Sequence, residues 1–197
     1  MLTFQLSYDY RCPFAKNIHL HVIEALRAGA DFDVTFVPWT MSQGYLASGA
    51  PDVWDDPTRD PEHLALAVSA SVRDLQPERF LDVHEVLFRA RHVRAIRLVT
   101  WDEITAALAQ IDVDLDLVAE DLASRRPFKV IGESFREFER YEAFGVPTFV
   151  VGDDATFVRY MNEPTDPSAS IALIESLVSL MSNESALNEF KHTKVPM

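Results

Sequence analysis

The sequence predicts a mixed α/β fold in which a block of helices interrupts a β-sheet domain. The first part of the chain reads strand, helix, strand, a β-α-β pattern that implies a parallel pair of strands. A long stretch of helical periodicity follows, and the chain then returns to helix, hairpin and helix. We therefore expect one globular unit, made of a sheet domain with an inserted helical domain.

The β-α-β unit is predicted from the N-terminal part of the chain. Residues 2–8 alternate apolar and polar side chains, which is typical of a strand. Pro13 suits the first position of a helix because its missing N–H costs nothing there, and the apolar stripe that follows ends before Gly29. Residues 32–39 are apolar and rich in strand-forming side chains, which completes the unit.

The domain boundary is predicted in residues 41–61, the longest stretch without periodicity and one punctuated by Gly, Pro and Asp. The inserted helical domain is assigned to residues 62–126. The sheet domain is assigned to residues 1–61 and 127–197.

Four helices are expected in and around the insertion, over residues 61–75, 77–93, 100–110 and 114–126. Thr100 and Glu103 have the spacing of a capping box, which marks the start of the third helix. The alternation of residues 111–117 fits a short strand equally well, so this segment stays open. The rest of the chain predicts a helix over 129–144, a hairpin of strands 148–151 and 156–161, and a helix over 167–190.

Charge and composition argue against several classes of function. The chain of 197 residues carries 31 acidic and 18 basic side chains, a formal charge of -13, which phosphate backbones and anionic lipids would repel. We expect no nucleic-acid partner, no membrane partner and no metal or nucleotide site, since no spaced ligand set or phosphate-binding glycine motif is present. The N-terminus shows no signal-peptide pattern, so the protein is expected to be cytoplasmic.

Cys12 is the only cysteine of the chain, which rules out an internal disulfide. It precedes Pro13, where the first strand gives way to the first helix. A sulfur at the start of a helix lies near unpaired N–H groups and the positive end of the helix dipole, which favour thiolate over thiol. Lys16 and Arg11 would add positive charge. We therefore predict a nucleophile, with a small buried hydrophobic side chain as the alternative.

Two motifs in this order of elements resemble the DsbA-like family of thioredoxin-fold proteins, along nearly the whole chain. They are Tyr-Asp-Tyr-Arg-Cys-Pro-Phe-Ala-Lys at 8–16 and Phe-Gly-Val-Pro-Thr-Phe-Val-Val at 144–151. The resemblance implies a C-P-x-C position at the start of the first helix and a cis-proline loop that faces it. The matching residues here are Cys12, Pro13, Phe14, Ala15, Val146 and Pro147. The narrower likeness is to cytoplasmic, actinobacterial-type members related to mycothiol-dependent nitroreductases and polyketide-associated oxidoreductases.

Ala15 stands where a dithiol enzyme of this kind has its second cysteine, so resolution of a mixed disulfide on Cys12 needs another molecule. The candidate is a low-molecular-weight thiol, glutathione or mycothiol, acting as a co-substrate with no bound cofactor. We expect monothiol oxidoreductase chemistry in which Pro147 shapes the thiol-binding loop, Val146 offers backbone groups and Lys16 supports the thiolate.

Substrate contacts are expected around the cysteine. Pro13, Phe14 and Ala15 flank it, and Phe14 would touch the substrate. Trp39 follows the second parallel strand, where clefts commonly hold ligands, so it could line a pocket for a small apolar substrate. Ordinary core packing explains Trp39 as well.

Two other classes of function stay open. Kappa-type glutathione transferases and hydroxychromene carboxylate isomerases share this architecture and use a bound thiol, although they typically present serine at the position of Cys12. A non-catalytic binding or chaperone module is the other class, because Ala15 removes the resolving thiol. The sequence also leaves open whether residues 62–126 bury a homodimer interface.

Overall fold

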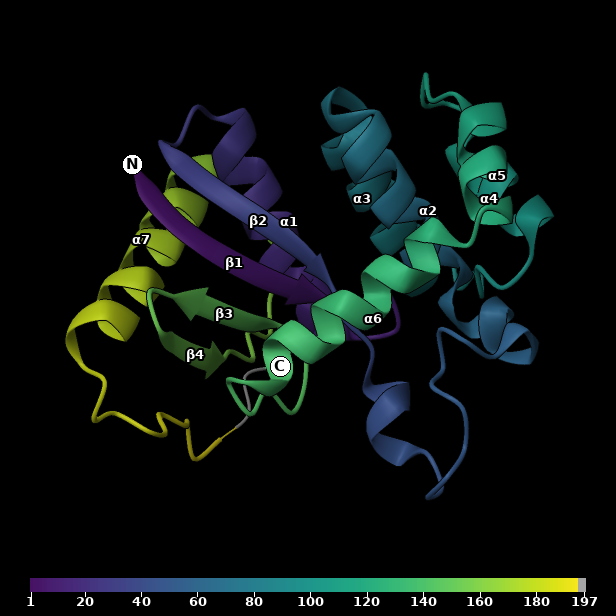
Figure 1. The fold of residues 1–197 in the computed structure, drawn as a ribbon. Helices are drawn as coiled ribbons and strands as arrows, with labels where there is room; N and C mark the ends of the chain where they lie inside the picture. Colours follow the sequence, from purple (N-terminus) through teal and green to yellow (C-terminus); the bar gives the residue numbers. More distant parts are fainter. Residues whose placement is uncertain (195–197) are drawn as a thin grey trace.

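The computed structural model describes residues 1–194, and its elements follow the predicted order (Figure 1). The strands and helices outside the insertion are β1 Leu2–Tyr8, α1 Pro13–Arg27, β2 Phe32–Pro38, α6 Arg126–Glu139, β3 Thr148–Val151, β4 Asp154–Phe157 and α7 Pro167–Asn183. The insertion contains α2 Asp60–Leu75, α3 Pro77–His92, α4 Trp101–Leu108 and α5 Leu115–Ala123, preceded by two short 3-10 helices, η1 Met41–Tyr45 and η2 Pro57–Arg59. Within residues 1–194, no helix is both long and apolar enough to cross a membrane.

The four strands form one mixed sheet in the order β2-β1-β3-β4. β1 pairs in parallel with β2, while β1 with β3 and β3 with β4 are antiparallel. The predicted β-α-β unit and hairpin are therefore confirmed. α1 and α7 pack together on one side of the sheet, α3 packs alongside α1, and α2 and α6 contact β2 (Figure 1). Cys12 follows the carboxyl end of β1.

The largest differences from the expected element boundaries are at the C-terminal ends of α6, α7 and β4, while α6 begins at Arg126 rather than 129 and β4 at Asp154 rather than 156. α6 ends at Glu139 and not at 144, because Glu142 has a positive φ of 54°, which a right-handed helix cannot include. Phe144 is 72% exposed in the turn that follows. α7 ends at Asn183 rather than 190, since its last buried side chain is Met181 and helices depend on a buried face. The second hairpin strand ends at Phe157.

The open segment 111–117 contains the start of a helix and no strand. The side chain of Asp114 accepts a hydrogen bond from the N–H of Leu117 and caps α5. The capping box at Thr100 is present as predicted, with both of its reciprocal hydrogen bonds to Glu103.

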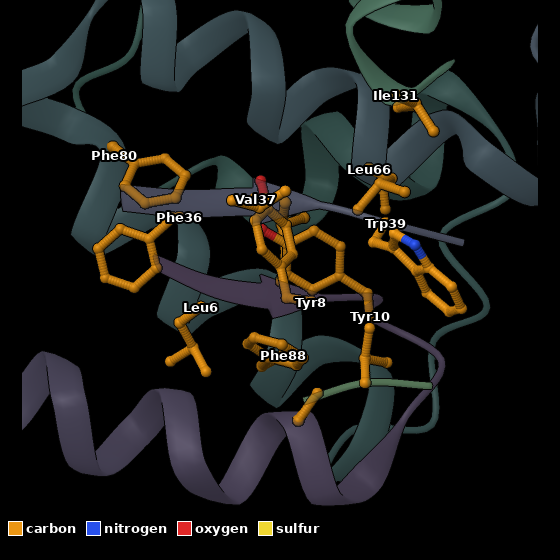
Figure 2. Packing of buried hydrophobic residues seen from close by; sticks show 14 of the residues in the cluster. Leu6, Tyr8, Tyr10, Phe36, Val37, Trp39, Leu66, Phe80, Phe88 and Ile131 are labelled. Atoms are coloured by element: carbon orange, nitrogen blue, oxygen red, sulfur yellow. The ribbon is translucent and has the colours of Figure 1, made fainter. Parts of the chain in front are cut away.

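The core is richest in aromatic side chains where the sheet meets the insertion (Figure 2). Tyr8 at the end of β1 packs edge-on against Tyr10, and Phe36 of β2 lies 5.1 Å from Phe80 of α3 between ring centroids. α6 packs against α2, α5 and β2, so it joins the inserted helices to the sheet.

A buried chain of hydrogen bonds crosses this core. The Tyr10 hydroxyl lies 2.6 Å from His84 Nδ1, His84 Nε2 lies 2.8 Å from His19 Nδ1, and His19 Nε2 lies 3.1 Å from the Ser7 carbonyl oxygen. None of these four residues is more than 2% exposed. We call them the Tyr10–Ser7 relay.

The Ser7 carbonyl determines which nitrogen of each histidine in the Tyr10–Ser7 relay carries the proton. The Ser7 carbonyl can only accept, so His19 Nε2 carries a proton and its Nδ1 accepts from His84 Nε2–H. His84 Nδ1 then accepts from the Tyr10 hydroxyl. Burial lowers the pKa of His19 to about 3 and that of His84 well below its usual value, which keeps both rings neutral.

Candidate functional site

Cys12 occupies the N-cap of α1, directly after β1, with Pro13 in the first turn. The backbone N–H of Ala15 donates to Cys12 Sγ at 3.4 Å, and the N–H of Cys12 donates to the Asp9 carbonyl at 3.0 Å. Ala15 itself is fully buried, while the Cys12 side chain is partly exposed. The sulfur therefore sits where the sequence predicts it, at the junction of strand and helix.

The loop before β3 faces this sulfur. The peptide bond between Val146 and Pro147 is cis, and the Cys12 thiol donates a hydrogen bond to the Val146 carbonyl at 3.1 Å. The loop is held to β1, because the N–H of Thr148 donates to Ser7 Oγ at 2.9 Å. Two motifs far apart in the chain are thus in direct contact.

The acidity of Cys12 differs from the expected direction. Burial raises the pKa of the thiol and outweighs the N–H groups of Ala15 and Phe14, which lower it. The carboxylate of Asp9 raises the pKa further, and the charge of Arg159 lowers it. The prediction that the helix terminus produces a thiolate omitted desolvation. The S–H bond to the Val146 carbonyl also favours the neutral thiol.

Lys16 is paired with a carboxylate and is not a free cation beside the thiol. Its ammonium group forms an ion pair with Glu163, and the guanidinium of Arg89 binds the same carboxylate at 3.2 Å. The hydrogen bond from Lys16 is the main reason that the pKa of Glu163 is lowered. The main charges that act on the pKa of the Cys12 thiol are those of Asp9 and Arg159. The ion pair between Lys16 and Glu163 connects α1 to the segment before α7.

Arg11 is likewise neutralised. Its guanidinium approaches Asp9 to 2.6 Å and also donates to Thr40 Oγ1 at 2.8 Å and Ser42 Oγ at 3.0 Å. Asp9 is 6% exposed, so this ion pair is partly withdrawn from water. Arg11 holds the loop after β2 to the cysteine motif and contributes no free charge to the sulfur.

Arg159 is the cation that sequence reasoning missed. Its guanidinium lies over the Phe14 ring, 4.7 Å from the centroid, and its charge reaches Cys12. The predicted hairpin could have placed Arg159 near the cysteine, because β4 runs antiparallel to β3 and Phe157 pairs with Thr148. Residues just after β4 must therefore return to the loop that faces the cysteine.

The two tryptophans near the site belong to the core. Trp39 is 3% exposed and stacks on Phe135, with ring centroids 5.3 Å apart and an interplanar angle of 17°. Trp54 covers Gly132, where an added Cβ would lie 2.7 Å from the indole ring. Trp39 is thus buried against Phe135 of α6, which agrees with the core-packing alternative for this residue. Phe14 remains partly exposed beside the cysteine.

Two cavities border the elements that carry the site. One of about 110 Å³ is lined by Tyr10, Arg11 and residues 97–99. A larger one of about 300 Å³ lies along α1, α3 and the segment before α7, with Arg27 among its lining residues. Neither is lined by Cys12. Among residues 1–194, no group of three or more His, Cys, Asp or Glu side chains is placed to hold a metal ion.

Comparison with known proteins identifies the architecture. No family model matches the sequence, and no curated protein matches it. Among solved structures, the cytosolic disulfide reductase DsbM from Pseudomonas aeruginosa superposes with a TM-score of 0.61 at 17% identity, covering 91% of this chain and 100% of that one. MdbA, a thiol-disulfide oxidoreductase from Actinomyces oris, gives 0.60 at 17% identity, covering 90% of this chain and 79% of that one.

The chain has a DsbA-like thioredoxin fold. A 2-hydroxychromene-2-carboxylate isomerase also shares this fold, with a TM-score of 0.61 at 12% identity and coverage of 95% of this chain and 100% of that one. Proteins with the DsbA-like fold thus include both thiol oxidoreductases and an isomerase, and the fold does not choose between them. The choice depends on the residues around Cys12.

Proposed function

We propose that this protein is an oxidoreductase that performs thiol-disulfide exchange through Cys12 alone, with a low-molecular-weight thiol as its co-substrate. The observation that carries the proposal is the position of the sulfur, between the N-terminus of α1 and the Val146 carbonyl on the cis-proline loop. The known structures with this fold include a cytosolic disulfide reductase described with GSH, which supports the choice of co-substrate class.

The exchange step follows from the hydrogen bonds of the sulfur. In the free protein the S–H bond occupies the Val146 carbonyl. A cysteinyl ligand that pairs with this loop would donate its own N–H to that carbonyl, as extended ligands do along exposed backbone. Cys12 would then lose its carbonyl acceptor and deprotonate more readily. As a thiolate it attacks a disulfide sulfur, forms a mixed disulfide and releases the other half as a thiolate.

The test is the mass of the intact protein after incubation with oxidised glutathione. We expect one glutathione adduct on the wild-type protein and none on Cys12→Ser. Ala15→Cys restores a second thiol three residues along the chain, so its adduct should convert to an internal disulfide and release glutathione. An unmodified wild-type protein at pH 8, beside an unfolded sample that reacts, would contradict the proposal.

The similarity to the isomerase favours a second candidate, in which the protein binds a thiol and uses it to rearrange an electrophilic substrate. That reaction consumes no disulfide. Glutathione-dependent turnover of a chromene carboxylate without net oxidation of thiol, retained in Cys12→Ser, would support it in place of exchange.

A further inference from the structure

Among the described residues 1–194, one basic side chain near Cys12 has no acidic partner. Arg11 and Lys16 form ion pairs with Asp9 and Glu163. Arg159 is exposed, and within residues 1–194 it takes part in no ion pair. Its planar group retains the paired N–H donors that match a carboxylate.

Arg159 is also held in place. The contact of its guanidinium with the Phe14 ring fixes it above the first turn of α1. The backbone pairing of Phe157 with Thr148 fixes the end of β4 beside the cis-proline loop. The guanidinium therefore lies over the first turn of the helix that Cys12 caps, and the backbone that carries it leaves β4 beside the loop that contains Val146 and Pro147.

We propose that Arg159 binds a carboxylate of the co-substrate and so selects anionic, peptide-type thiols over neutral ones. This inference rests on the exchange chemistry proposed for Cys12. The protein carries a formal charge of -13, which repels an anionic thiol in general, so a local cation is needed to bring one to the sulfur. Glutathione carries carboxylates, whereas mycothiol, a sugar thiol, carries none. The position of Arg159 favours the glutathione class.

The test compares two small disulfides that differ in charge. Each is attacked by the Cys12 thiolate, the disulfide bond breaks, and the departing thiolate takes a proton from water. The probes are 3,3′-dithiodipropionate, with two carboxylates, and bis(2-hydroxyethyl) disulfide, which is neutral. Rates of adduct formation are measured by intact mass after acid quenching, for the wild type, Arg159→Gln, Arg159→Lys and Lys129→Gln. Lys129 is exposed on α6, and its substitution changes the net charge equally.

The ratio of the anionic rate to the neutral rate is the decisive quantity, because a change in Cys12 acidity alters both rates together. We expect Arg159→Gln to lower this ratio about fivefold, the size of an exposed ion pair. Arg159→Lys should keep most of it, and Lys129→Gln should leave it within about twofold of the wild type.

Two results would overturn the proposal, and they have different meanings. Reaction with both disulfides at a ratio that Arg159→Gln does not change would remove the role of Arg159 and leave exchange at Cys12 intact. Failure of the wild type to react with either disulfide would remove both proposals.

Discussion

Tyr10 and Cys12 belong to the same short turn between β1 and α1, yet they face opposite environments. The Tyr10 hydroxyl starts the Tyr10–Ser7 relay, in which each group has a partner and none is more than 2% exposed. The Cys12 sulfur has one carbonyl acceptor, one N–H donor and access to solvent. A buried network in which all hydrogen bonds are formed is costly to rearrange, whereas the partially exposed sulfur can exchange its hydrogen-bond partners for those of a ligand.

The relay also couples the two halves of the molecule. His84 belongs to α3 of the insertion, His19 to α1 and Ser7 to β1. The side chain of Ser7 binds the N–H of Thr148, which follows the cis-proline. Ser7 therefore connects the Tyr10–Ser7 relay to the cis-proline loop that faces Cys12.

Replacing His84 should have the largest effect and should act on stability. His84→Leu removes the hydrogen-bond partners that His84 supplies to the Tyr10 hydroxyl and to His19 Nδ1, and each buried polar group that loses its partner costs about 1–3 kcal/mol. We expect the free energy of unfolding in urea to fall by roughly 2–5 kcal/mol. Cys12→Ser should change it by less than about 1 kcal/mol. Equal losses in the two variants would erase the distinction between the two sides of the turn.

The second-largest effect is expected from acid, which should lower the free energy of unfolding through the two histidines of the Tyr10–Ser7 relay. The folded pKa of His19 is lowered to about 3 from 6.5, and that of His84 is lowered as well, so the unfolded chain binds more protons in this range. Stability is complete above pH 6.5 and falls as the pH drops toward the folded values, by about 1.4 kcal/mol per pH unit for each histidine.

Urea unfolding at pH 6.0, 5.5 and 5.0 measures this slope above the usual range of carboxylates. In His84→Leu one titrating ring is gone, so the slope should decrease by about 1.4 kcal/mol per pH unit. An unchanged slope would mean that other groups cause the acid sensitivity.

The smallest effect is expected from Lys16, on the exposed side. The rate of Cys12 alkylation should rise with pH to a midpoint above about 8.5, the value of a free cysteine, because burial raises the pKa of the thiol. Lys16→Gln should change the rate at pH 7.5 by less than about twofold, since its charge is already paired with Glu163. A fall of tenfold in Lys16→Gln would restore Lys16 as a support for the thiolate.

The sequence alone predicted most of the architecture, because periodicity and turn residues record local preferences. β1, α1 and β2 were predicted from alternation, from Pro13 and from a run of strand-forming side chains, and the hairpin was predicted from two neighbouring strand patterns. Both α6 and α7 were predicted to extend past their observed C-terminal ends, since the periodicity of a sequence does not show where a helix stops packing against the rest of the protein. Segment 111–117 stayed open because its alternation suits two structures.

The sequence by itself also determined that Cys12 lies at the start of a helix without a resolving thiol at Ala15. Only the tertiary structure decided the surroundings of Cys12. Burial raises the pKa of its thiol, Lys16 pairs with Glu163, and the guanidinium of Arg159 lies over the Phe14 ring. The physical reason is distance. Capping and periodicity act within a few residues, whereas desolvation and ion pairing depend on groups that the fold brings together from far along the chain.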